Sequence, residues 1–198
     1  MLDAVVCVHF AGANLNRVLT ATLEYAEWTI LVPQEVCDEI RGKDRKYPGL
    51  ERRWAALESS RYVRVLPRLV IGEASQARAV QVLEALRDAE FEQAIRRPKD
   101  LGECVVVAQG VRLREQGHQV TLLMDDRGGL AMAADWDLTC ATIEDVLVLA
   151  VHAGCFRTVE ELARAYRKLQ EYGSGLPGFR DTLLGAAFRH WEEGAQTP

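Results

Sequence analysis

Short apolar runs alternate with longer segments of helical periodicity along this chain, and this alternation limits the folds that it can adopt. Five runs rich in β-branched and aliphatic residues predict strands at residues 4–10, 29–32, 62–66, 119–124 and 138–141. Parallel strands need long crossover connections, which are usually helices. The order therefore predicts an α/β fold with a mainly parallel central sheet and helices on both faces.

Helical spacing, caps and breakers define the segments between these runs. Leu15, Val18, Leu19 and Leu23 recur at helical spacing, and Thr142 and Thr158 are good N-caps. The predicted helices cover residues 14–28, 33–40, 50–57, 73–95, 103–114, 126–134, 143–152, 158–171 and 179–193. We expect one domain over residues 1–155, with a helical insertion at about 41–98, and a helical extension over residues 156–198 that packs on it.

Composition excludes several classes of protein. The hydrophobic content of 48% and charged content of 27% are ordinary for a soluble globular chain of 198 residues. No apolar run approaches the roughly 20 residues needed to span a bilayer, and no secretory leader is visible. We therefore expect a cytoplasmic protein without a membrane partner. The five cysteines are dispersed without a CxxC pair and the four histidines do not cluster, which argues against a zinc site.

Positive charge is concentrated in one part of an acidic chain. The formal net charge is −5, yet residues 41–68 hold nine Arg and Lys against three Asp and Glu, a local charge of +6. Such a segment could neutralise phosphates of a nucleic acid. A solvated helix face and loop would have the same composition.

Separated acidic residues fall where an α/β fold can bring them together. Asp125 and Asp126 follow the predicted strand 119–124 directly, Glu39 lies in the helix after strand 29–32, Glu103 opens a helix, and Asp3 opens the first apolar run. Ligand sites of parallel sheets lie at the carboxyl ends of the strands. Converging carboxylates would form an oxygen-rich site for a hard cation such as Mg²⁺. Taken singly, each acid also fits an N-cap or a surface position.

The order of these pieces resembles the PIN-domain family. The resemblance rests on Asp3 with its apolar continuation, on the segment LVPQEVCDEI at 31–40, on GECVVVA at 102–108 and on LLMDDR at 122–127. It extends over roughly residues 2–155. It implies a three-layer α/β/α sandwich with extra C-terminal helices. It also implies a metal-dependent ribonuclease, in some members the toxin of a toxin–antitoxin pair.

The resemblance also implies roles for particular residues. Asp3, Glu39, Glu103 and Asp126 would be the catalytic carboxylates that bind Mg²⁺ or Mn²⁺, and Asp125 could take the place of Asp126 in the metal site. Arg127 or the basic segment could hold the RNA backbone. An antitoxin protein and a second copy of the chain are the partners that the family suggests.

Two alternatives remain open. Ala4 and Val5 stand where the family often has polar residues after its first Asp, which suggests a catalytically inactive PIN-like module that binds RNA or protein. A different α/β fold, such as a small nucleotide-binding regulator, lacks support because GxxxxGK[ST] does not occur, and the one GxGxxG match, GSGLPG at 173–178, follows a predicted helix rather than a predicted strand. His9 and the four tryptophans are expected in the core, and Cys104 has no histidine partner to make it a nucleophile.

Overall fold

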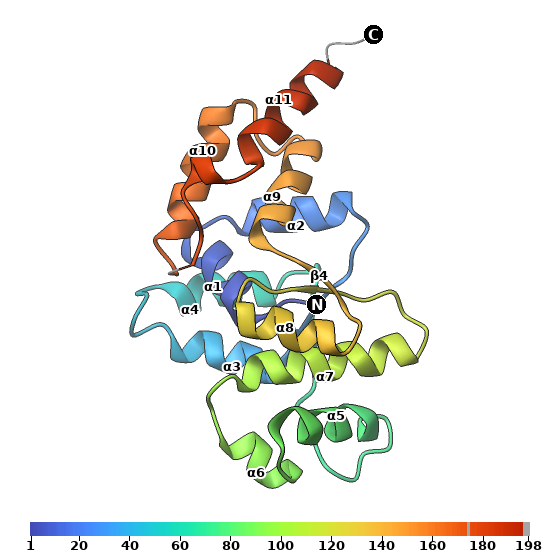
Figure 1. Cartoon of the computed structure of the whole chain (residues 1–198). Coiled ribbons are helices and arrows are strands. Elements are labelled where there is room, and N and C mark those ends of the chain that lie inside the picture. The colour runs from blue at the N-terminus through green and yellow to red at the C-terminus, as the bar shows by residue number, and fades with distance from the viewer. Residues whose placement is uncertain (174, 196–198) are drawn as a thin grey trace.

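The computed structural model describes residues 1–173 and 175–195 and combines short parallel strands with many helices (Figure 1). Strand β1 (Ile30–Pro33) pairs with β2 (Val63–Leu66) in parallel, with Ile30 opposite Val63. Strand β3 (Thr121–Leu123) pairs with β4 (Thr139–Ala141) in parallel, with Thr121 opposite Thr139. The predicted α/β class with parallel strands is therefore confirmed, although each paired region is only a few residues long.

An extended segment at residues 1–3 lies between the two strand pairs and joins them. Leu2 N donates to Leu31 O of β1 at 3.0 Å, while Asp3 N donates to Leu123 O of β3 at 3.0 Å. Leu123 N donates to Met1 O at 2.7 Å, and Leu2 forms a parallel bridge with Leu123. The spatial order is β2, β1, residues 1–3, β3, β4. The hydrogen-bonded middle of the fold is thus formed by segments far apart in the sequence.

Helices surround these strands and extend beyond them. Figure 1 shows α5 and α6 below α7, and α9, α10 and α11 at the opposite end of the molecule with the C-terminus. The helices are α1 (Ala4–Gly12), α2 (Asn16–Tyr25), α3 (Gln34–Gly42), α4 (Leu50–Glu58), α5 (Ala77–Arg87), α6 (Phe91–Arg96), α7 (Leu101–Glu115), α8 (Arg127–Asp135), α9 (Ile143–His152), α10 (Val159–Gln170), a 3₁₀ turn at Phe179–Asp181, and α11 (Leu184–Ala195).

The strand predicted at residues 4–10 is wrong, because this segment forms helix α1. Asp3 caps it by accepting a hydrogen bond from Val5 N at 3.2 Å. Almost every residue of α1 is buried, so its sequence is apolar on all sides. A helix buried all round has no polar face, and its apolar run cannot be told from a buried strand by periodicity.

The single helix predicted over residues 73–95 is also wrong. The chain leaves α5 at Asp88, which adopts a left-handed conformation with φ 43°, and restarts as α6 at Phe91. Glu84 supports the break, because its Oε1 accepts from Phe91 N at 2.9 Å. The last helix likewise starts later than predicted: Thr182 is extended, its Oγ1 accepts from Leu184 N at 3.4 Å, and α11 begins there.

The core is formed where helices meet the strands. Trp54 and His9 are buried as expected, whereas Trp28 is 38% exposed. All five cysteines are free, and Cys7, Cys37 and Cys104 are buried. In the part of the chain that the structure describes, no helix is long and apolar enough to cross a membrane.

Candidate functional site

Two of the predicted acids lie at the ends of neighbouring extended segments. Asp3 ends the segment 1–3, and Asp126 follows β3, to which that segment is hydrogen-bonded. Both residues are also N-caps. Asp126 Oδ2 accepts from Gly128 N at 2.7 Å and Gly129 N at 3.3 Å at the start of α8. The strand order therefore places these carboxylates at the same edge, as the carboxyl-end rule predicts.

Glu103 and Glu39 approach this edge from helices. Glu103 lies in the first turn of α7, where the helix dipole favours negative charge. A Cβ added at Gly129 in α8 would lie 3.4 Å from Glu103 Oε2, so this carboxylate reaches the turn that Asp126 caps. Glu39 on α3 lies over α7, because a Cβ added at Gly102 would be 2.5 Å from Glu39 Oε2.

The acids act on one another electrostatically. The pKa of Glu103 is raised to about 7, first by burial and then by the charges of Asp3, Asp126, Asp100 and Glu39. The pKa of Asp3 is likewise raised to about 6, because burial, with a smaller contribution from the charge of Glu39, outweighs the opposing N–H groups of Val5 and Ala4. Negative charges gathered in this way repel one another and favour either protons or a bound cation.

Asp125 faces a different neighbourhood from Asp126. Burial raises the pKa of Asp125 to about 6, and the charges that add to this rise are Asp145 and Glu144 of α9 as well as Asp126. The N–H of Ile143 opposes the rise. The charge of Asp126 raises the pKa of Glu103, and a Cβ added at Gly128 would lie 3.0 Å from Asp126 Oδ2 and 4.0 Å from Glu103 Oε2. Of the adjacent pair, Asp126 is the one directed toward the other acids.

The donor chemistry of this cluster suits a hard cation. Asp3 is 1% exposed, and its Oδ1 has no hydrogen-bond partner, which is costly for a buried carboxylate oxygen. The other candidate donors are carboxylate oxygens as well, which Mg²⁺ and Mn²⁺ prefer. Among residues 1–173 and 175–195, however, no three acidic, histidine or cysteine side chains stand close enough to hold one ion as placed. Binding would therefore require side-chain adjustment.

Lys43 is a member of this site that the sequence reasoning missed. Its Nζ lies 2.6 Å from Glu39 Oε1, and its charge lowers the pKa of Asp3. The signal was present in the sequence, because Lys43 stands four residues after Glu39 and helical neighbours at that spacing commonly pair. Lys43 therefore adds a positive charge beside the acids, and its ion pair with Glu39 competes with the binding of a metal ion by Glu39.

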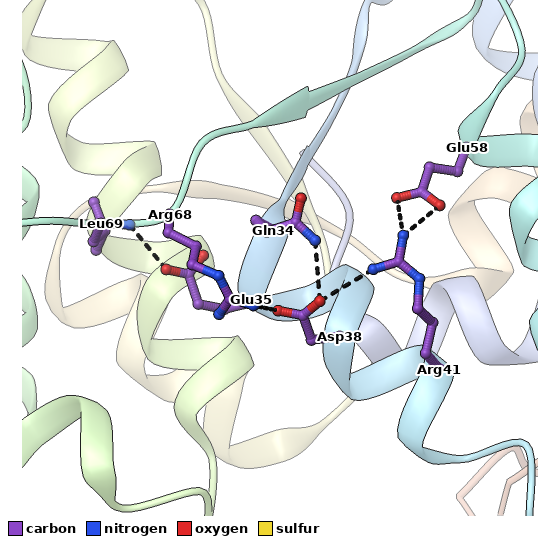
Figure 2. Close-up of polar contacts among 7 residues, drawn as sticks. All are labelled: Gln34, Glu35, Asp38, Arg41, Glu58, Arg68 and Leu69. Carbon is purple, nitrogen blue, oxygen red and sulfur yellow. Dashed lines mark hydrogen bonds and ion pairs between the residues drawn. The ribbon is translucent and has the colours of Figure 1, made fainter.

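A polar network on another part of α3 fixes the helix that carries Glu39 (Figure 2). Arg41 donates to Asp38 at 3.1 Å and to both oxygens of Glu58 on α4 at 2.7 Å. Asp38 also pairs with Arg68, and Glu35 Oε1 accepts from Leu69 N at 2.9 Å. The network ties α3 to α4 and to the chain after β2, so Glu39 is presented from an anchored helix.

We expect Glu58→Gln to lower the free energy of unfolding by about 1 kcal/mol, because the Glu58 side chain is 18% exposed and its bond to Arg41 uses both oxygens. The control is Glu115→Gln, which removes an Arg78 pair that also uses both carboxylate oxygens but is 41% exposed on each side. It should cost less than Glu58→Gln, because solvent screens an exposed pair. Urea unfolding measures both, and equal losses would show that the α3 network contributes no more than a surface pair.

The basic segment divides into engaged and free cations. Arg41, Lys43 and Arg68 are bound to carboxylates within the fold. Arg45, Lys46 and Arg52 are exposed, and none of them forms an ion pair within the described residues. Arg127 begins α8 beside Asp126 and is also exposed. Free cations therefore lie in the turn that follows Lys43 and next to Asp126.

Comparisons of this chain with protein-family models, with curated proteins and with solved structures gave no match. Functional arguments for this protein therefore depend on its own geometry.

Proposed function

We propose that this protein is a metal-dependent ribonuclease of the PIN-like type. The observation that carries the proposal is that Asp3 and Asp126 lie at one edge of the strands and act electrostatically on Glu103, with a buried oxygen of Asp3 left without a partner. Mutual repulsion among these acids is what a site for Mg²⁺ or Mn²⁺ requires before the ion binds. The alternation of parallel strands and helices supports the same proposal.

The proposed roles follow from position. Asp3, Glu103 and Asp126 would hold the cation, and Glu39 would join them when Lys43 releases it. A cation bound there supplies a water of lowered pKa and neutralises charge on a phosphodiester. Arg127, beside Asp126, would hold the RNA backbone. Asp125, directed to α9, would support the turn rather than bind metal.

The finer parts of the proposal rest on the family resemblance of the sequence. They are the three-layer sandwich, the toxin role, inhibition by an antitoxin protein, a homodimer and a cytoplasmic location. Each of these parts can be wrong without affecting the proposed catalytic site. Purification with a co-expressed neighbouring gene product would test the antitoxin partner.

The direct test is cleavage of a panel of labelled structured RNAs with Mn²⁺, with Mg²⁺ and with EDTA. We expect cleavage with either ion and none in EDTA. Cleavage that persists in EDTA would exclude the proposed metal site, and absence of cleavage under all conditions would favour a binding role.

Gly102→Ala tests the position of Glu39 without altering any charge. The new methyl group would meet Glu39 Oε2, so the Glu39 side chain must move away from α7. We expect kcat/KM for RNA to fall about 10-fold, while the melting temperature stays equal or rises, because Ala is favoured over Gly within a helix by about 0.5–1 kcal/mol. Gly194→Ala is the control, because a Cβ added there meets nothing within 4 Å. Gly110→Ala cannot serve as the control, because its Cβ would contact Leu122.

One observation favours the second candidate, a PIN-like module that binds RNA without cleaving it. Glu39 is paired with Lys43, and the acids do not form a closed three-residue cluster as placed. Such a module would show no rise in melting temperature with Mg²⁺, because an ion that binds the native state must stabilise it. A thermal titration separates the two candidates before any substrate is found.

A further inference from the structure

Two tyrosines from distant parts of the chain meet beside the free cations of the basic segment. The rings of Tyr47, in the turn between α3 and α4, and Tyr172, just after α10, have centroids 5.4 Å apart and are tilted by 51°. Both side chains are half-buried. Figure 1 shows the lower end of α10 descending to this turn and to α1. Both rings pack in part against the core, and the remainder of each is exposed where these three segments meet.

Positive groups lie against both rings. Lys46 Nζ is 5.0 Å from the centroid of Tyr47, and Arg53 Cζ is 6.0 Å from that of Tyr172. Arg53 is fixed, because its Nε donates to Ala11 O at 2.8 Å, whereas Lys46 and Arg45 are exposed. Asp44, the acid in the same turn, accepts a hydrogen bond from Glu51 N at 2.8 Å. The surface is thus aromatic and carries cations that are free to meet an external anion.

This surface leads to the acidic site. Lys43, which pairs with Glu39, accepts through its carbonyl the hydrogen bonds of Lys46 N and Tyr47 N, both at 3.0 Å. Helix α1 connects Asp3 to Gly12, against which Tyr172 packs, and its nine residues span about 13 Å. Because α1 is buried, the exposed route from the tyrosines to the acids runs past Lys43 and Glu39, whose side chains are 33% and 39% exposed.

We propose that Tyr47 and Tyr172, with Arg45 and Lys46, form a binding surface for single-stranded RNA that guides the strand to the acidic site. The inference rests on the proposed ribonuclease function and adds the form of the substrate. Aromatic rings stack on any base, and cations beside them contact the backbone, which is how sequence-tolerant single-strand surfaces bind. A base that stacks on Tyr47 displaces the Lys46 ammonium from the ring and leaves it to meet the adjacent phosphate.

Other surfaces are less suited to this role. Arg64 belongs to the same basic segment but lines a cavity of about 670 Å³ with Met1, Trp28 and Thr121. That cavity lies at the amino ends of the strands, away from Asp3 and Asp126. Arg64→Gln therefore provides a control that removes one positive charge on a different part of the molecule, for comparison with Arg45→Gln or Lys46→Gln alone.

The test is fluorescence anisotropy of labelled 12-nucleotide single-stranded RNA and of a matching duplex, in EDTA so that no cleavage occurs. We expect Tyr47→Ala and the double variant Arg45→Gln, Lys46→Gln each to weaken single-strand binding about 10-fold. The double variant should also lower the salt dependence of binding by one to two phosphate contacts. Tyr47→Phe and Arg64→Gln should bind like the wild type.

Several outcomes would overturn the inference. They are unchanged binding in Tyr47→Ala and in the double variant, an equal loss in Arg64→Gln, and binding of the duplex that matches the single strand. Melting curves guard against misfolding of Tyr47→Ala, and the double variant changes only exposed side chains. RNA cleavage with Mn²⁺ that is unaffected by these variants would remove the guide surface and leave the proposed ribonuclease intact. RNA binding that depends on Tyr47, without any cleavage, would support the guide surface and contradict the proposed ribonuclease.

Discussion

Asp126→Asn should reduce metal-dependent RNA cleavage at least about 100-fold, because loss of even an outer partner of a catalytic metal commonly costs 10- to 100-fold. The expected change in stability is small. Asp126 caps α8 through Gly128 N and Gly129 N, and an Asn oxygen can accept the same bonds. Cleavage rates with Mn²⁺ and melting temperatures in EDTA measure the two effects separately.

The adjacent residue provides the matched control for this prediction. Asp125→Asn changes the same charge one position earlier, on a side chain that accepts from Ile143 N–H and lies near Glu144 and Asp145. We expect it to keep cleavage within about threefold of wild type. If Asp125→Asn abolished cleavage and Asp126→Asn did not, the assignment of the two carboxylates would have to be exchanged. Equal activity in both variants would exclude the pair from the metal site.

Asp3→Asn should make the metal-free protein more stable at pH 8 by on the order of 2 kcal/mol. Burial raises the pKa of Asp3 from 3.8 to about 6, so holding its charge in the folded state opposes folding. For a chain of this length, 2 kcal/mol corresponds to roughly 5 °C in melting temperature. The Asn side chain can still accept the cap bond from Val5 N.

The pH dependence has a definite sign. Because the pKa of the folded protein lies above the unfolded value, the folded state holds this proton more tightly than the unfolded state does. The contribution of Asp3 to the free energy of unfolding of the wild type is therefore highest below pH 4. It falls as the pH rises from about 4 to 6 and stays reduced above pH 6. The difference between Asp3→Asn and wild type should be small at pH 4 and full at pH 8. A constant difference across this range would show that Asp3 does not titrate as described.

Metal binding should offset the destabilisation that the buried charge of Asp3 causes in the wild type at pH 8. Mg²⁺ or Mn²⁺ at pH 8 should raise the melting temperature of the wild type, since an ion bound by the acids stabilises only the native state. The same ion should stabilise Asp3→Asn much less. This readout needs no RNA substrate, so it remains informative even if the protein cleaves none of the RNAs tried.

The sequence predicts most helices and the parallel class correctly because polar residues mark their ends. Thr142 and Asp145 form a reciprocal capping box at α9, and Gly154 adopts a left-handed φ of 69° just after that helix. The sequence does not predict helix α1, because an apolar run without a polar face fits a buried helix as well as a buried strand. The break at Asp88 was missed because a left-handed Asp is a local feature without a strong sequence signal.

The candidate site was predictable only in part. The position of Asp126 follows from the end of the predicted strand 119–124. Asp3 was expected at the start of a strand over residues 4–10, which is helix α1, so its place at the carboxyl end of residues 1–3 was not predicted. The Glu39–Lys43 pair, the different surroundings of Asp125, and the meeting of Tyr47 with Tyr172 all depend on how distant segments pack. Spacing along the chain does not determine such contacts.

The three-residue segment between the strand pairs also has a kinetic consequence. Its hydrogen bonds join residues 1–3 to β1 and to β3, and one of them, Met1 N to Thr121 O, spans 120 positions of the sequence. Pairings at such separation form late and slow a folding reaction, because loop-closure entropy is lost before the contacts form. The two strand pairs can form as separate units first. We therefore expect Asp3 and Asp126 to come together late, so that the acidic edge is among the last parts of this molecule to be assembled.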